Sequence, residues 1–124
     1  MTPTPPWTLV YADGSANVFR FQADRVGVRF TYEPIRPEQS STGTYSGGAP
    51  IEQLMAGDDP RLAAVWEQAL ALEADTEHHA DERNKGDGAF TLTTGEQRRR
   101  FLVVRAATRT FEAYLRHELR GLDE

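Results

Sequence analysis

Val26-Gly27-Val28-Arg29-Phe30-Thr31-Tyr32-Glu33 is the stretch that decides the fold of this 124-residue chain. Val26, Val28, Phe30 and Tyr32 alternate with glycine, charged or hydroxyl residues, and this period of two is typical of a strand with one buried and one solvated face. Pro34 follows and ends the pairing, because proline has no backbone N–H to donate to a neighbouring strand. The first half of the chain is therefore predicted to contain a β-sheet.

The residues that precede this strand repeat its pattern. Large apolar side chains alternate along the chain from Trp7 to Tyr11, and Asp13-Gly14 supplies residues that tolerate positive φ, as hairpin turns require. A second strand is expected over residues 17–23. Residues 1–6, which include three prolines, are expected to form an extended tail.

The second half of the chain has helical spacing at both ends. Asp59-Pro60 is a strong helix start, because aspartate accepts from the first N–H groups and proline has the φ favoured at the first helical position. The apolar stripe that follows predicts a helix to about Ala80, capped by Gly86 or Gly88. Residues 51–55 are too few to be assigned to a helix or a strand.

A second hairpin is expected over residues 89–93 and 98–105, with its turn near residues 94–96. Its second strand has large residues on both faces, which favours a central position in the sheet. An amphipathic helix is predicted over residues 106–120, with Glu112 and Arg116 paired on its exposed face.

These elements predict a single α+β domain over residues 1–124. A mainly antiparallel sheet of about five strands carries two packed amphipathic helices, in the order strand, strand, strand, loop, helix, strand, strand, helix. Four side chains of the two helices are expected in the core: Trp66, Leu70, Phe111 and Leu115.

Composition narrows the classes of function. The chain has no cysteine, which excludes disulfides, thiolate metal sites and cysteine nucleophiles. Its net charge is −5, and 39% of its residues are hydrophobic, close to the average for globular proteins. The N-terminus lacks the pattern of a signal peptide and no apolar run is long enough to span a membrane, so a cytoplasmic protein without a membrane partner or cofactor is expected.

The glycine-rich loop at residues 40–50 is the first candidate for function. Its glycine spacing is that of a phosphate-binding loop, but Ala49 and Pro50 stand where the lysine and the hydroxyl residue are needed. The residues around Ser46 are also close to G-x-S-x-G, the nucleophile motif of hydrolases, but the first glycine of that motif is missing. The loop is therefore expected either to be a simple connection or to bind a partner or ligand with five residues: Thr44, Tyr45, Ser46, Gly47 and Gly48.

The second candidate is the end of the first predicted helix. Asp75 lies one turn before His78 and His79, and Glu82 lies one turn after, so carboxylate and imidazole groups are expected to share a face. This spacing favours a divalent-metal site or a small enzyme as the alternative function. A solvated acidic helix end is the simpler interpretation, because adjacent histidines diverge by roughly 100° on a helix.

Arginines are concentrated near the C-terminus, beginning with Arg98-Arg99-Arg100. Half of the 14 lysines and arginines follow position 97, which suggests a surface for phosphate or nucleic acid. The acidity of the whole chain argues against a nucleic-acid partner, and strand arginines are expected to pair with the acidic helix.

The chain carries Tyr45-Ser46-Gly47-Gly48, followed by a long helix, a hairpin and a final helix. This order resembles the layout of emfourin-type protein inhibitors of bacterial metallopeptidases. The shared residues are Ser46, Gly47 and Gly48, and residues 7–37 have no counterpart in it. The resemblance implies an inhibitor-like, protein-binding role for the loop. The sequence thus favours a non-enzymatic binding or regulatory protein.

Overall fold

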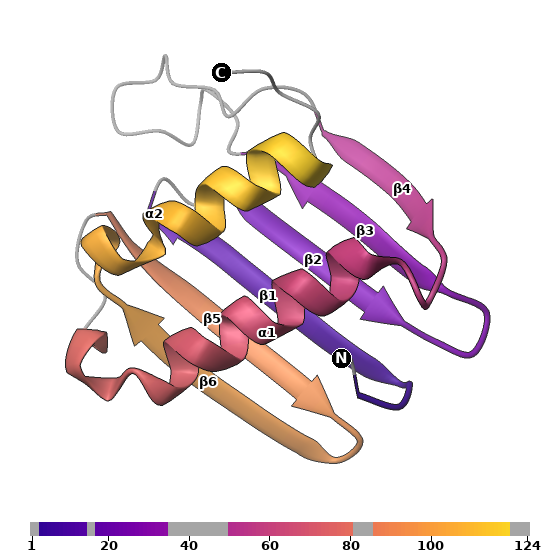
Figure 1. The fold of residues 1–124 in the computed structure, drawn as a ribbon, viewed down its shortest axis with the longest axis horizontal. Coiled ribbons are helices and arrows are strands. Elements are labelled where there is room, and N and C mark those ends of the chain that lie inside the picture. Colours follow the sequence, from indigo (N-terminus) through magenta and orange to yellow (C-terminus); the bar gives the residue numbers. More distant parts are fainter. Residues whose placement is uncertain (1–2, 15–16, 35–49, 81–85, 120–124) are drawn as a thin grey trace.

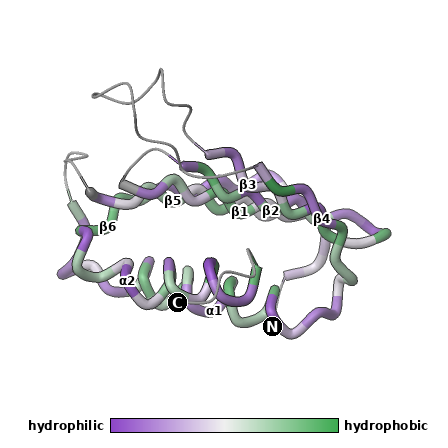
Figure 2. The backbone as a smooth tube through the Cα atoms, turned by 90° about the horizontal axis from the view of Figure 1, so that it is seen from above, coloured by the Kyte–Doolittle hydropathy of each residue, from purple (hydrophilic) through white to green (hydrophobic). Residues whose placement is uncertain are grey.

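A computed structural model describes residues 3–14, 17–34, 50–80 and 86–119. Within these residues, six strands form one antiparallel sheet in the order β4-β3-β2-β1-β5-β6 (Figure 1). The strands are β1 (Trp7–Gly14), β2 (Val18–Ala23), β3 (Val28–Glu33), β4 (Ile51–Met55), β5 (Gly86–Thr94) and β6 (Gln97–Val103). Two helices, α1 (Pro60–Ala74) and α2 (Arg105–Tyr114), lie on the same face of the sheet (Figures 1 and 2). The α+β fold class is confirmed.

The core lies between the sheet and the helices. Because side chains alternate between the two faces of a strand, the register places Leu9 beside Phe21 and Leu92, all on the helix side. These three side chains are fully buried. The aromatic side chains of β1, β2, β3 and β5 complete this face of the sheet: Trp7, Tyr11, Phe19, Phe21, Phe30, Tyr32 and Phe90.

Helix α1 begins where the sequence predicts. Asp59 is its N-cap and accepts from the Arg61 backbone N–H at 2.9 Å, and Pro60 is the first helical residue. The predicted end near Ala80 is wrong, because the helix ends at Ala74 and is followed by one 3-10 turn, η2 (Thr76–His78). Residues 78–80 then pair with the end of β6.

The prediction that residues 98–105 form a central strand is also wrong. Strand β6 lies at one edge of the sheet. The Ala80 N–H donates to the Leu102 carbonyl and the Val104 N–H to the His78 carbonyl, both at 2.9 Å. The irregular segment after α1, rather than a further strand of the described residues, therefore occupies the outer edge of β6 near its end.

Three short segments differ from the expectation or were left open by it. Val26, expected on the buried face of its strand, precedes β3 and is 95% exposed. Residues 51–55 form β4, which pairs with β3 and raises the predicted strand count by one. Gly86 and Gly88 belong to β5 and cap no helix. Gly88 packs so closely on the ring of Tyr11 that an added Cβ would lie 2.6 Å from Tyr11 Cε1. Close packing, rather than a turn, therefore requires glycine at position 88.

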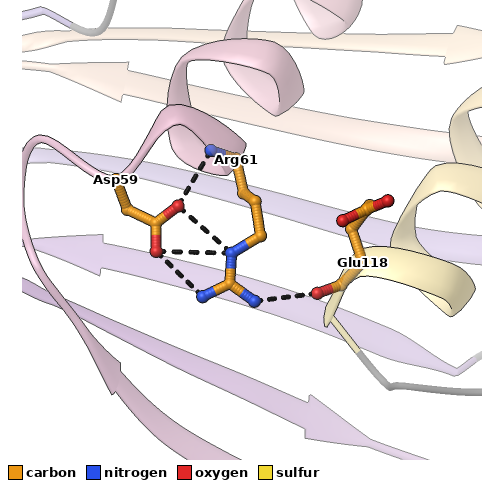
Figure 3. Close-up of polar contacts among 3 residues, drawn as sticks. All are labelled: Asp59, Arg61 and Glu118. Atoms are coloured by element: carbon orange, nitrogen blue, oxygen red, sulfur yellow. Dashed lines mark hydrogen bonds and ion pairs between the residues drawn. The ribbon is translucent and has the colours of Figure 1, made fainter.

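The C-terminal helix continues as a π-helical turn, η3 (Leu115–Leu119), which is tied to the start of α1. The Arg61 guanidinium donates to Asp59 Oδ2 at 2.8 Å and to the Glu118 carbonyl at 2.9 Å (Figure 3). One side chain thus joins the N-terminus of one helix to the end of the other. Of the four expected core residues, Trp66, Phe111 and Leu115 are buried, whereas Leu70 is only partly buried.

No helix among the described residues has the length and apolar character needed to cross a membrane.

Candidate functional site

The face of the sheet opposite the helices carries no helix among the described residues (Figure 2). We call it the open face. It consists of the side chains that alternate with the core residues: Thr8, Val10, Ala12, Val18, Arg20, Gln22, Arg29, Thr31, Glu33, Glu52, Leu54, Ala89, Thr91, Thr93, Arg98, Arg100 and Leu102. Small and hydroxyl-bearing residues occupy its centre, and its long charged side chains lie on β2, β3, β4 and β6.

The arginine run is divided between the two faces of β6. Arg99 points to the helix side, where its Nη1 lies 3.1 Å from Glu73 Oε1 of α1. The expected pairing of a strand arginine with the acidic helix is therefore confirmed for this residue. Arg98 and Arg100 lie on the open face, are exposed, and form no ion pair with any residue that the structure describes.

The open face has a local excess of positive charge. Within the described strands the open face carries four arginines, at positions 20, 29, 98 and 100, against two glutamates, at positions 33 and 52. Arg20 and Glu33 pair at 3.1 Å on adjacent strands. The chain as a whole has a net charge of −5, so this arginine excess lies on a protein that is acidic elsewhere. The open face is thus suited to an acidic partner.

A shallow hollow of about 340 Å³ lies over β5 and β6. Four of its lining residues belong to the open face: Ala89, Thr91, Arg100 and Leu102. The small side chains of β5 form its floor and Arg100 supplies a cation at its side. The hollow is large enough to hold a side chain of a partner. The Arg100 guanidinium could bind a carboxylate on that side chain.

A second hollow, of about 490 Å³, lies beside the start of α1. It is lined by Pro3, Thr4, Pro5, Gly57, Asp58, Asp59 and Ala63. The Asp59 carboxylate is already engaged by Arg61 and by the first turn of α1. Of the two aspartates that line this hollow, Asp59 therefore has a structural role.

A polar pair lies on the helix side, between β1 and α2. The Tyr11 hydroxyl donates to Glu112 Oε2, and the Tyr11 ring packs edge-on against Phe111, with centroids 5.1 Å apart. Burial, reinforced by the hydrogen bond to Glu112, raises the pKa of the Tyr11 hydroxyl, which stays protonated. Burial also raises the pKa of the Glu112 carboxyl, against the opposing effect of the hydrogen bond from Tyr11.

Glu112 was predicted on the exposed face of its helix, and this position is wrong. The carboxyl is partly buried and faces the sheet, although Arg116 still lies close enough to lower its pKa. The pair with Tyr11 fixes α2 on the sheet. The hydroxyl itself is fully buried with its ring, so this pair offers no accessible group for a substrate.

The structure separates the residues of the predicted metal site. His78 Nδ1 lies 2.5 Å from Asp75 Oδ2, so these two side chains do meet. His79 instead stacks on Phe101, with centroids 5.3 Å apart, and its Nε2 donates to the Leu72 carbonyl at 2.9 Å. Glu82 lies outside the described residues. Within the described part of the chain, no group of three or more histidine, cysteine, aspartate or glutamate side chains is arranged to hold a metal ion.

The predicted binding loop lies outside the described residues, as do Thr44, Tyr45, Ser46, Gly47 and Gly48. In the chain, the loop follows β3 and leads into β4. The arginine run is visible in the sequence, but its division between the two faces of the strand was not predicted. Strand alternation alone assigns Arg98 and Arg100 to one face and Arg99 to the other. The pair of Tyr11 with Glu112 gives no signal in the sequence, because 101 positions separate the two residues.

No family model, no curated protein and no solved structure matches this chain. The resemblance to emfourin-type inhibitors through Ser46, Gly47 and Gly48 therefore stays a hypothesis.

Proposed function

We propose that this protein is a non-enzymatic binding or regulatory module whose open face recognises an acidic surface of a protein partner. The single observation that carries the proposal is the placement of Arg98 and Arg100. Both are exposed on the open face, and neither has an ion-pair partner among the described residues. Cations held on a rigid strand lose less conformational freedom on binding than cations on a loop, which favours recognition.

The loop at residues 40–50 contributes to the same proposal. Strand β4, which follows it in the chain, places Glu52 and Leu54 on the open face. The loop carries one aromatic side chain, Tyr45, among glycine and hydroxyl-bearing residues, a composition found in adaptable binding loops. We therefore include Tyr45 in the proposed recognition surface.

The composition of the open face favours a protein partner over a single-stranded nucleic acid. Proteins that bind single strands stack bases on aromatic side chains. The aromatic side chains of β1, β2, β3 and β5 all face the helices, and the described open face contains none. Carboxylates of a protein would instead be met by arginines, which bind them in a bidentate geometry.

The experiment compares partner capture from the source cell by the wild type and by matched variants. Arg98→Glu/Arg100→Glu reverses the charge on the open face, and Arg109→Glu/Arg116→Glu makes the same change on the helix side, in α2 and η3. We expect the first variant to lose a partner that the second retains. A partner set that is unchanged by Arg98→Glu/Arg100→Glu contradicts the role of the open face, and one unchanged by Tyr45→Ala contradicts that of the loop.

A divalent-metal site at the end of α1 is the second candidate, and the contact between His78 and Asp75 favours it. Both side chains are roughly half exposed, at 49% and 41%, so an ion can reach the pair. Two protein ligands leave the remaining positions to water, and we expect weak binding. Calorimetric titration with Zn²⁺ tests it: heat that is unchanged in His78→Ala removes this candidate.

A further inference from the structure

The two edges of the sheet differ in how they end. At β6, the segment after α1 uses the outer backbone groups of the strand, through the bonds at Leu102 and Val104 and the bridge between His79 and Val103. At β4, no strand of the described residues pairs with the outer edge. An open edge presents N–H and C=O groups that a further strand can complete.

Strand β4 has few of the features that keep edge strands from pairing. Natural edges are blocked by lysine, proline, bulges or inward-pointing charges. The five residues of β4 contain a single charged side chain, Glu52, and their pairing with β3 has no register shift. Leu54 is 77% exposed on the open face, one of two large apolar side chains so exposed among the described residues.

From this edge we propose that the protein forms a homodimer, in which β4 pairs antiparallel with β4 of a second copy and joins the two sheets. A two-fold axis at Gln53 places Leu54 opposite the partner's Glu52, and Glu52 opposite the partner's Leu54. Ile51, Gln53 and Met55 keep their places on the helix side, because the axis preserves the alternation of the strand.

Charge complementarity selects a second copy as the occupant. Arg29 pairs in register with Leu54, so one row across the dimer reads Arg29, Leu54 and the partner's Glu52. Adjacent strands lie about 4.8 Å apart, which places Arg29 roughly 10 Å from the partner's Glu52, and the two long side chains can meet over Leu54. The axis creates this pair twice. Neither Arg29 nor Glu52 forms an ion pair with a described residue of its own chain.

This proposal is independent of the role given to Arg98 and Arg100, because β4 and β6 lie at opposite edges of the sheet. Sedimentation equilibrium of the full chain, from about 10 μM to about 1 mM, measures the dimer dissociation constant. We expect a concentration-dependent dimer. A protein that remains a monomer at about 1 mM overturns the proposal.

Two variants, each of which places a glutamate at an exposed apolar position, locate the interface. Leu54→Glu places a carboxylate opposite the partner's Glu52, and we expect it to weaken the dimer at least tenfold, because like charges directly opposite destabilise strand pairing. Val26→Glu is the matched control: Val26 is 95% exposed but lies in the β2–β3 turn, outside the proposed interface. A dimer that survives Leu54→Glu, or that Val26→Glu disrupts equally, overturns the proposal.

A mixing experiment separates contacts between copies from contacts within one. Arg29→Glu and Glu52→Arg should each be largely monomeric, because each homodimer would hold two repulsive pairs. An equimolar mixture should form a heterodimer, in which both pairs are again attractive. Thermal melts of each variant alone establish that it is folded. Folded variants whose mixture stays monomeric overturn the proposed register.

Discussion

Gly88→Ala tests the packing that directs Tyr11 toward Glu112. The added Cβ would lie 2.6 Å from Tyr11 Cε1 and 2.8 Å from its hydroxyl oxygen, distances at which something must move. The ring has little room to retreat, because it is fully buried and its centroid lies 4.6 Å from that of Phe90 and 5.1 Å from that of Phe111. We therefore expect the substitution to destabilise the fold and to disturb the hydrogen bond to Glu112.

The magnitude follows from two opposing effects. Overpacking a filled core costs about 1–3 kcal/mol, and the upper part of this range applies because the clash is with a buried ring. Replacing glycine by alanine also restricts the unfolded chain, which offsets roughly 0.4–1 kcal/mol. The net loss in the free energy of unfolding should be about 1–2 kcal/mol.

Urea unfolding, followed by the fluorescence of Trp7 and Trp66, measures this loss. Both indoles are buried, with ring centroids 5.1 Å apart, so unfolding changes their surroundings. Gly57→Ala is the control, because a Cβ there meets nothing within 4 Å, and its stability should be unchanged or slightly higher. In a Tyr11→Leu background the cost of Gly88→Ala should fall below about 0.5 kcal/mol. An equal cost in both backgrounds would exclude a clash with the Tyr11 ring as the cause.

Three further substitutions probe other contacts. Glu112→Gln tests the pH dependence: burial raises the pKa of the Glu112 carboxyl above its unfolded value near 4.5, so its stabilising effect is present at low pH and is lost as pH rises through the folded pKa. Wild type should gain stability relative to the variant as pH falls from neutrality toward 4.5, and a constant difference in urea unfolding would contradict this. Arg61→Met removes the bond to the Glu118 carbonyl and should cost about 1 kcal/mol; an unchanged melting temperature would exclude that contribution. Phe111→Ala should cost about 3–5 kcal/mol, and Leu70→Ala clearly less because Leu70 is only partly buried; equal costs would contradict the core assignment.

Local pattern was sufficient for much of the fold. Alternation along residues 28–33 predicts which side chains face the core. This prediction needs no knowledge of the neighbouring strands, because successive side chains of any strand point to opposite faces of the sheet. The N-terminus of α1 was equally readable, because Asp59 and Pro60 act on the adjacent turn.

The features that the sequence did not predict depend on contacts between distant segments. Residues 78–80 pair with the edge of β6 near its end, and the side chain of His79 stacks on Phe101 there. Glu112 faces inward because Tyr11, from the opposite end of the chain, donates to it. At the candidate site, the alternation of Arg98, Arg99 and Arg100 was available from the sequence, but the side covered by the helices was not.

Photo-cross-linking in the source cell tests whether the open face binds a protein partner. A photoreactive residue at Gln22 lies on the open face, and one at Ala71 lies on the exposed surface of α1. We predict a covalent adduct with a partner protein from position 22, absent from position 71 and lost when Arg98→Glu/Arg100→Glu is added. Adducts that form equally from both positions, or that persist after the charge reversal, would contradict the account.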